Sequence, residues 1–243
     1  EDTKALLAQW DAEGTVEDNL QAACRENLLG KASRSRAEHV VRAIRERYFT
    51  DVEVGLALVH LAQHGWTNAR LNLLLYFFTG QSDRLIYDFV VEEVYPLWEK
   101  GLKDMPTEFA WQAIARWIDD GETTTEWGEY TALRVARGLL ATLRDFGILE
   151  GEAKKSIAAM HVPAETCSFI AFYLMDQFGS GQKVLEANDW RLFFWEPDQV
   201  ERNLVEAEQK KLLQYRSTGQ VVRIDFPADS LTEYAHALVE RTD

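Results

Sequence analysis

The sequence has few cysteines, few prolines and no long apolar run, and each shortage excludes a class of protein. Only Cys24 and Cys167 occur in 243 residues, so the chain is not a disulfide-stapled secreted scaffold. Both cysteines fall in apolar helical patterns and are expected to be reduced thiols. With 5 prolines, 47% hydrophobic residues and 27% charged residues, the composition is that of a globular protein and not of a disordered chain.

The apolar runs are too short to cross a bilayer. The longest, residues 73–78 and 169–175, fall far below the roughly 20 residues that a membrane-spanning helix needs. No secretory signal is recognisable at the start of the sequence. We therefore expect no membrane insertion and a cytoplasmic location.

Patterns for catalysis, metal binding and cofactor binding are also missing. Residues 121–125 lack the Gly-Lys-Ser/Thr ending of a phosphate loop. His60 and His64 stand four apart on one helical face, but no Cys or third His lies near them in the sequence to complete a metal site. Adjacent acidic pairs would point apart on a helix. The chain is thus expected to be a non-enzyme with no metal and no cofactor, and an enzyme is the least favoured alternative.

Positive charge is scarce overall but concentrated in one segment. The formal net charge is -14, whereas residues 25–47 contain seven basic and three acidic residues. Such an island in an acidic chain predicts a binding site for an anion, and nucleic acid is the leading candidate. The alternative is a row of arginines that are simply solvated on the outer face of a helix.

Helical periodicity dominates the first two thirds of the chain. Helices are predicted at residues 3–10, 16–29, 52–63, 67–78 and 83–98, with a further basic helix capped by Ser33 or Ser35. In that basic helix Arg34, Arg42 and Arg45 share a flank. The fold class is therefore mainly α, and residues 1–105 are predicted to form an N-terminal helical bundle.

A second module is predicted over residues 106–180. Helices at 108–118 and 125–146 are separated by a polar turn, the outline of helix-turn-helix DNA recognition. One flank of the longer helix collects two aromatic and three basic residues, Trp127, Tyr130, Arg134, Arg137 and Arg144. The alternative is a buried helix with solvated arginines.

The periodicity breaks after this helix. Residues 150–162 are predicted to form a short hairpin or wing, in which Lys154 and Lys155 could meet phosphate, before a helix at 165–178. Residues 181–243 are predicted to form a C-terminal segment with a helix at 198–211, a hairpin over 212–226 around a turn at 217–219, and a closing helix at 230–241.

Three segments of the sequence resemble one known family. They are A-L-L-A-Q-W-D at 5–11, R-E-N-L-L-G-K-A-S-R-S-R-A-E at 25–38 and A-R-G-L-L-A-T-L-R-D-F-G-I-L at 136–149. Together they resemble the BrxA family, small accessory proteins of bacterial BREX bacteriophage-exclusion systems. The resemblance implies a helical bundle similar to the NusB fold, a winged-helix-like portion and DNA binding without catalysis.

The leading hypothesis is a non-catalytic DNA-binding accessory protein of a BREX system, with other BREX subunits as further partners and RNA as an alternative ligand. The predicted partner is double-stranded DNA, and the predicted contact residues are basic: Lys31, Arg34, Arg36, Arg42, Arg45, Arg134, Arg137, Arg144, Lys154 and Lys155. The competing hypothesis is an acidic adaptor that assembles defence proteins without contacting DNA, with the arginine island forming an ion-pair network.

Overall fold

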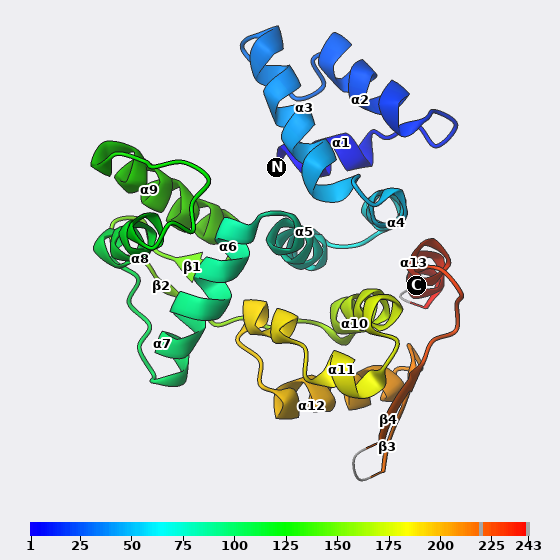
Figure 1. Ribbon diagram of the computed structural model, residues 1–243. Helices are drawn as coiled ribbons and strands as arrows, with labels where there is room; N and C mark the ends of the chain where they lie inside the picture. The colour runs from blue at the N-terminus through cyan, green and yellow to red at the C-terminus, as the bar shows by residue number, and fades with distance from the viewer. Residues whose placement is uncertain (219–220, 242–243) are drawn as a thin grey trace. The chain divides into compact units, whose positions relative to one another are not determined.

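The computed structural model describes residues 1–218 and 221–241 and confirms a mainly helical fold with a short antiparallel strand pair near the C-terminus (Figure 1). Packing groups the chain into two compact units. Unit 1 contains residues 1–83, 162–187 and 197–243, and unit 2 contains residues 84–161 and 188–196. The predicted three-part division at residues 105 and 180 stays a prediction.

Unit 1 begins with five helices, and polar side chains cap the starts of the last four. They are α1 Asp2–Ala8, α2 Val16–Arg25, α3 Arg34–Tyr48, α4 Val52–Gln63 and α5 Asn68–Ser82. The side chains of Thr15, Ser33, Asp51 and Thr67 accept hydrogen bonds from backbone N–H groups in the first turns of α2 to α5. Of the two serines considered as the cap of the basic helix, Ser33 is thus the one that caps it.

The core of unit 1 is formed by α5 and by α10 Ala164–Phe178, two helices that are apolar on nearly all sides. Residues 73–80 of α5 and 164–172 of α10 are buried without a break. Aromatic rings join the two helices, since Phe78 packs edge-on against both Phe169 and Tyr173. These two apolar runs therefore form the centre of the hydrophobic core of unit 1.

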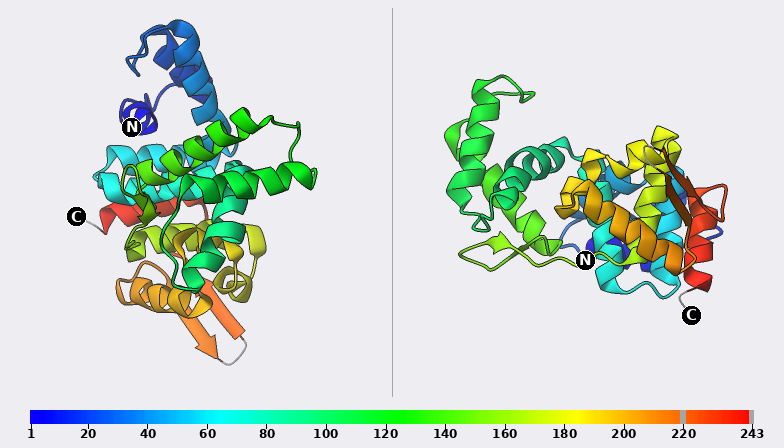
Figure 2. Two further views of the ribbon diagram at one scale, coloured as in Figure 1. Left: turned by 90° about the vertical axis from the view of Figure 1, so that its left-hand side faces the viewer. Right: turned by 90° about the horizontal axis from the view of Figure 1, so that it is seen from below.

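The C-terminal elements complete unit 1. They are α11 Gly181–Leu185, α12 Pro197–Gln209, β3 Gln214–Thr218, β4 Val221–Asp225 and α13 Leu231–Glu240. The α13 helix, red in Figure 2, packs along α4, and α12 packs on α10. The predicted hairpin is confirmed by antiparallel pairing of Tyr215 with Ile224. Of the turn predicted at residues 217–219, Ser217 and Thr218 instead belong to β3, and residue 219 lies outside the described residues.

Unit 2 begins with one predicted helix that the structure divides into three. It consists of α6 Arg84–Asp88, the π-helical turn η1 Phe89–Val94 and α7 Tyr95–Glu99. Pro96 stands in the first turn of α7. Proline lacks an N–H and its ring would clash with the carbonyl four residues earlier, so the wider π turn just before it allows the chain to continue as a helix.

The rest of unit 2 contains α8 Thr107–Asp119, α9 Glu129–Asp145, β1 Leu149–Glu150 and β2 Ser156–Ile157. The long helix was predicted to begin at residue 125 but begins at residue 129, with Gly128 at its N-cap. Glycine and a run of three threonines favour the extended turn over a further helical turn. As a result Trp127 lies before the helix and not on its basic flank.

A short segment from the C-terminal part of the chain also belongs to unit 2. It contains the 3₁₀ helix η2 Asn188–Phe193, which packs on η1. Arg191 lies over the ring of Tyr95, and the Tyr95 hydroxyl donates a hydrogen bond to the carboxylate of Glu196. Burial of Tyr95 and this carboxylate together raise the pKa of its phenol.

Candidate nucleic-acid interface

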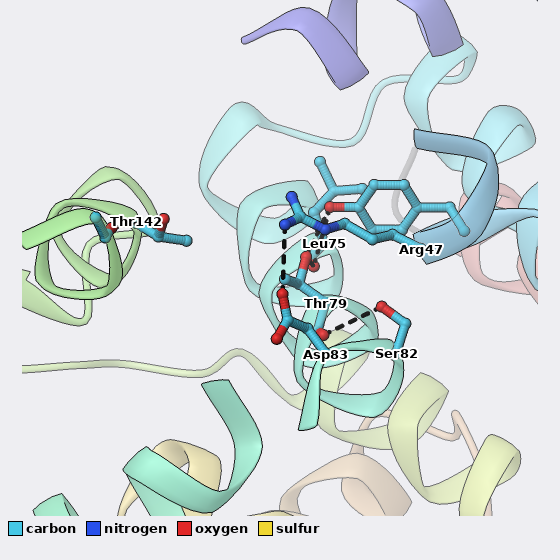
Figure 3. Close-up of polar contacts among 8 residues, drawn as sticks. Arg47, Leu75, Thr79, Ser82, Asp83 and Thr142 are labelled. Atoms are coloured by element: carbon cyan, nitrogen blue, oxygen red, sulfur yellow. Dashed lines mark hydrogen bonds and ion pairs between the residues drawn. The ribbon is translucent and has the colours of Figure 1, made fainter. Parts of the chain in front are cut away.

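The basic helix α3 is held by its C-terminal end. Its buried face consists of Ala37, Val41, Ile44 and Tyr48. The Tyr48 hydroxyl lies 2.8 Å from the Thr79 hydroxyl, which itself donates to the Leu75 carbonyl at 2.7 Å (Figure 3). Thr79 and Leu75 are buried residues of α5, so these hydrogen bonds hold Tyr48 in one place. They thereby fix the rotation of α3 about its axis and decide which of its side chains face outward.

A second contact at the same end uses an arginine of the basic island. Arg47 pairs with Asp83 at 3.5 Å, also drawn in Figure 3. Both side chains are about one-third exposed, so the pair helps to orient α3 on the end of α5 and contributes little to stability. The Arg47 guanidinium therefore already has a carboxylate partner within the protein.

A groove of about 940 Å³ lies between α2 and α3. Its floor is apolar and well covered, with Leu20 3%, Ala37 1% and Val41 6% exposed. Its lining includes five cations, Arg25, Lys31, Arg34, Arg42 and Arg45. Two carboxylates, Glu17 and Glu38, also line it, so the groove has a net positive charge inside an acidic chain.

Several of these cations already have carboxylate partners. Arg34 pairs with Glu38 at 2.8 Å and Arg45 with Glu17 at 3.0 Å, both on exposed surface. Exposed pairs are worth little and open readily, so these arginines can exchange partners with an incoming anion. Lys31 differs, because its side chain is only 23% exposed and its 2.8 Å contact with Asp2 fixes the loop before α3 to α1.

The structure separates Arg36 from the other predicted residues of α3. Arg34 and Arg36 are two positions apart, which is roughly 200° around a helix with 3.6 residues per turn. Arg34, Arg42 and Arg45 line the groove, whereas Arg36 does not. Among the described residues, neither Arg36 nor Arg42 has an ion-pair partner.

In unit 2 the helix α9 buries one stripe and exposes the other. Ala132, Ala136, Leu139, Leu140 and Leu143 are buried, largely against α8. Tyr130, Arg134, Arg137 and Arg144 follow the opposite face at helical spacing and are all exposed, Tyr130 by 79%. Arg144 pairs with Asp145, whereas Arg134 and Arg137 have no ion-pair partner among the described residues.

The predicted hairpin after α9 is confirmed. Leu149 pairs with Ile157 and Glu150 with Ser156, and Asp104 forms a bridge to Ser156 on the other side. Gly151 has a φ of +87 and lies so close to the Lys154 carbonyl that no side chain fits there. The tight turn leaves Lys154 exposed, while the Lys155 ammonium donates to the Glu152 carbonyl at 2.9 Å.

The predicted site residues thus form two groups, one in each unit. Lys31, Arg34, Arg42 and Arg45 gather at the groove of unit 1, and Arg36 lies on the far flank of α3. Arg134, Arg137 and Arg144 share the outer face of α9, and the two lysines belong to the hairpin that follows it.

A histidine cluster was not found by sequence reasoning. His60 and His64 were paired by their spacing, but the structure adds His236 from α13, with ring centroids 4.1 and 3.5 Å from that of His60 for His64 and His236 respectively. Burial and then the two neighbouring imidazoles lower the pKa of His60 to about 4. Only the packing of α13 on α4 brings His236 there, so no local signal could have revealed it.

The described residues contain no group of three or more His, Cys, Asp or Glu side chains that could hold a metal ion. Cys24 is partly exposed in the α2–α3 groove, and Cys167 is buried in α10, where desolvation raises the pKa of its thiol. Within the same residues, no helix is both long enough and apolar enough to span a bilayer.

The model of the family described as BrxA matches residues 1–174, which include the α2–α3 groove, α9 and the hairpin after it. No curated protein and no solved structure matches the chain.

Proposed function

Because this chain belongs to the BrxA family of BREX phage-defence systems, we propose that it is a non-catalytic accessory protein that binds double-stranded DNA. The observation that carries the proposal is the outer face of α9, where Arg134 and Arg137 are exposed and have no ion-pair partner among the described residues. In a chain of net charge -14, unpaired cations gathered on one helical face favour an anionic ligand.

The order of elements in unit 2 supports duplex DNA as that ligand. A helix, a short extended segment at Asp104, α8, α9 and a two-stranded hairpin follow one another as in a winged helix. In such modules the second helix of the helix-turn-helix lies in the major groove, and wing residues contact phosphate. We assign these roles to α9 and to Lys154 and Lys155, together with a NusB-like character for unit 1.

The groove of unit 1 supplies a second set of phosphate contacts in this proposal. Arg42 is free to bind, and Arg34 and Arg45 would exchange exposed carboxylate partners for phosphate. Arg36 faces away from the groove and would need a separate contact. Lys31 is tied to Asp2 and is expected to contribute least.

The first test is a titration of duplex DNA at several salt concentrations, followed by fluorescence anisotropy. The logarithm of the affinity should fall with the logarithm of salt concentration by about 0.9 for each phosphate contacted. Replacement of Arg134 or Arg137 by Ala should weaken binding and reduce the slope by about one each. Arg84→Ala is the matched control, because Arg84 is also exposed in unit 2 but is paired with Asp88.

The same titration separates the two flanks of α3. Arg42→Glu should weaken binding to all sequences alike, whereas Arg36→Glu, at a position on the far flank that is also exposed and without an ion-pair partner among the described residues, should have a smaller effect. Binding that is absent, or that does not depend on salt, would contradict the DNA-binding proposal. Incubation of the protein with DNA, Mg²⁺ and ATP should leave the DNA unchanged, as expected of a non-catalytic protein.

The ion pairs of unit 1 favour a second candidate function. Lys31, Arg34 and Arg45 each have a carboxylate partner within 3.0 Å, as expected of an adaptor whose arginine island is an internal network. The acidic remainder of the chain would then bind basic faces of other BREX proteins. Pull-downs with duplex DNA and with BREX proteins, each at two salt concentrations, distinguish the two functions.

A further inference from the structure

Gly138 is an unusual residue for its position in the middle of α9. It lies ten residues after the N-cap and seven before the last residue of a 17-residue helix, and it is exposed. Glycine is a poor helix former because it loses more backbone freedom than any other residue on folding. Alanine at the same place would stabilise the helix, so a glycine there requires a reason.

The fold of the protein supplies no such reason. A Cβ atom added at Gly138 would meet nothing within 4 Å, and its φ is not in the left-handed region. Gly55 and Gly181 show the contrast, because a Cβ at Gly55 would collide with the Phe49 ring and one at Gly181 with the Val222 carbonyl. Space for a side chain therefore exists at Gly138 but is left empty.

The empty position borders the unpaired cations of α9. Arg134 precedes Gly138 by four residues, about one turn back on nearly the same face, and Arg137 precedes it by one, so both arginines lie on the N-terminal side of the bare backbone. Ala141 extends the small surface by about one turn in the other direction. The Thr142 hydroxyl donates to the Gly138 carbonyl at 2.9 Å, which satisfies that oxygen from within the helix. The surface at Gly138 is therefore low and uncharged next to two arginines, and the Gly138 carbonyl needs no further partner.

We propose that Gly138 is the point at which a strand of duplex DNA comes closest to α9, with Arg134 and Arg137 pairing with phosphates on the N-terminal side of that point. The occupant follows from charge, because two exposed cations without carboxylate partners complement a polyanion. The contact of Gly138 itself is steric: its N–H is used within the helix, and the absence of a side chain lets the sugar–phosphate backbone lie against the helix. This inference rests on the proposed DNA binding of the same face.

The test compares Gly138→Ala and Gly138→Leu with Gly128→Ala in the full chain. Gly128, at the N-cap of the same helix, is also exposed, and a Cβ there also meets nothing within 4 Å. Gly138→Ala should raise Tm by about 2–4 °C, because alanine favours the helix. The same variant should weaken binding of a duplex oligonucleotide about threefold, and Gly138→Leu should weaken it at least about tenfold.

Binding by Gly128→Ala should stay close to that of the unsubstituted protein. If Gly138→Leu, with its melting transition intact, binds DNA as tightly as the unsubstituted protein, the close approach at Gly138 is wrong while DNA binding stands. If the unsubstituted protein shows no salt-dependent DNA binding, or if Arg137→Ala has no effect, the proposed function fails and this inference fails with it. A rise in Tm together with weaker DNA binding in Gly138→Ala supports the inference. If Gly138 had a purely structural role, a substitution that stabilises the protein would not weaken DNA binding.

Discussion

At the scale of single residues, the histidine cluster makes the stability of unit 1 depend on pH. His60 on α4 stacks with His64 of the same helix and with His236 of α13. The lowered pKa of His60 means that the folded protein holds it neutral where an unfolded chain would protonate it. Its contribution to stability is therefore complete above the unfolded pKa, near 6.5, and is lost as the pH falls toward about 4.

We therefore expect the melting temperature to fall between about pH 7 and about pH 5, and His60→Gln to make that fall smaller. Glutamine removes the titration and keeps a polar side chain at the α4–α13 contact. Thermal unfolding followed by circular dichroism over this pH range measures the difference. His39→Gln is the control, because His39 is exposed on α3 and belongs to no cluster. Parallel pH profiles for the protein and His60→Gln would show that the cluster does not govern acid stability.

Buried charge is a second property of single residues that the sequence did not reveal. Glu165, in the first turn of α10, is 9% exposed and lies 3.7 Å from Arg70 of α5 and 3.4 Å from Lys210, which follows α12. Its position at a helix N-terminus further favours the negative charge. Each partner comes from a different part of the sequence, so only the folded chain shows why this glutamate tolerates burial.

At the scale of elements, the sequence predicted the existence of most helices and narrowed the cap of one of them to two serines, whereas it placed the ends of the helices less well. The α3 helix illustrates what was predicted, since Ser33, one of the two serines proposed as its cap, accepts a hydrogen bond from the Arg36 N–H. The α9 helix illustrates the rest, because its start moved from the predicted residue 125 to residue 129. Near a helix end, the helix propensities of neighbouring residues differ by less free energy than tertiary packing contributes, so packing decides where the helix begins.

The cap of α3 gives a prediction at this scale. Ser33→Ala should lower the free energy of unfolding by about 1 kcal/mol, because it leaves a backbone N–H of the first turn without its partner. Urea unfolding measures the change. Ser35→Ala is the matched control: Ser35 is exposed inside the helix, where alanine is the better helix former, so no loss is expected. If Ser35→Ala lowered the free energy of unfolding more than Ser33→Ala does, Ser35 and not Ser33 would be the cap of α3.

At the scale of the whole molecule, the C-terminal third completes unit 1. The family match ends at residue 174, yet α12 packs on α10 and α13 packs along α4. Tyr234 of α13 is fully buried, stacks on Phe172 of α10 and donates a hydrogen bond to the Leu212 carbonyl at 3.0 Å. Residues beyond the matched region therefore belong to the same hydrophobic core as residues within it.

Tyr234→Ala should accordingly lower the free energy of unfolding by about 3–5 kcal/mol, the usual cost of removing a buried aromatic ring. Tyr130→Ala, which removes the same side chain from a position that is 79% exposed, should cost far less. Denaturant unfolding of both variants measures the two costs. Similar losses for the two variants would mean that α13 does not contribute to the core of unit 1.

The sequence by itself determined the fold class, the helical stripes, the C-terminal hairpin and the family, because these depend on periodicity and short motifs that are local in the chain. It also picked out the basic residues of α3 and α9, since charge is visible in composition. Only the tertiary structure decided that Arg36 faces away from the α2–α3 groove, that His236 meets His60, and that α13 closes unit 1. Such outcomes depend on contacts between residues far apart in sequence, which no local pattern specifies.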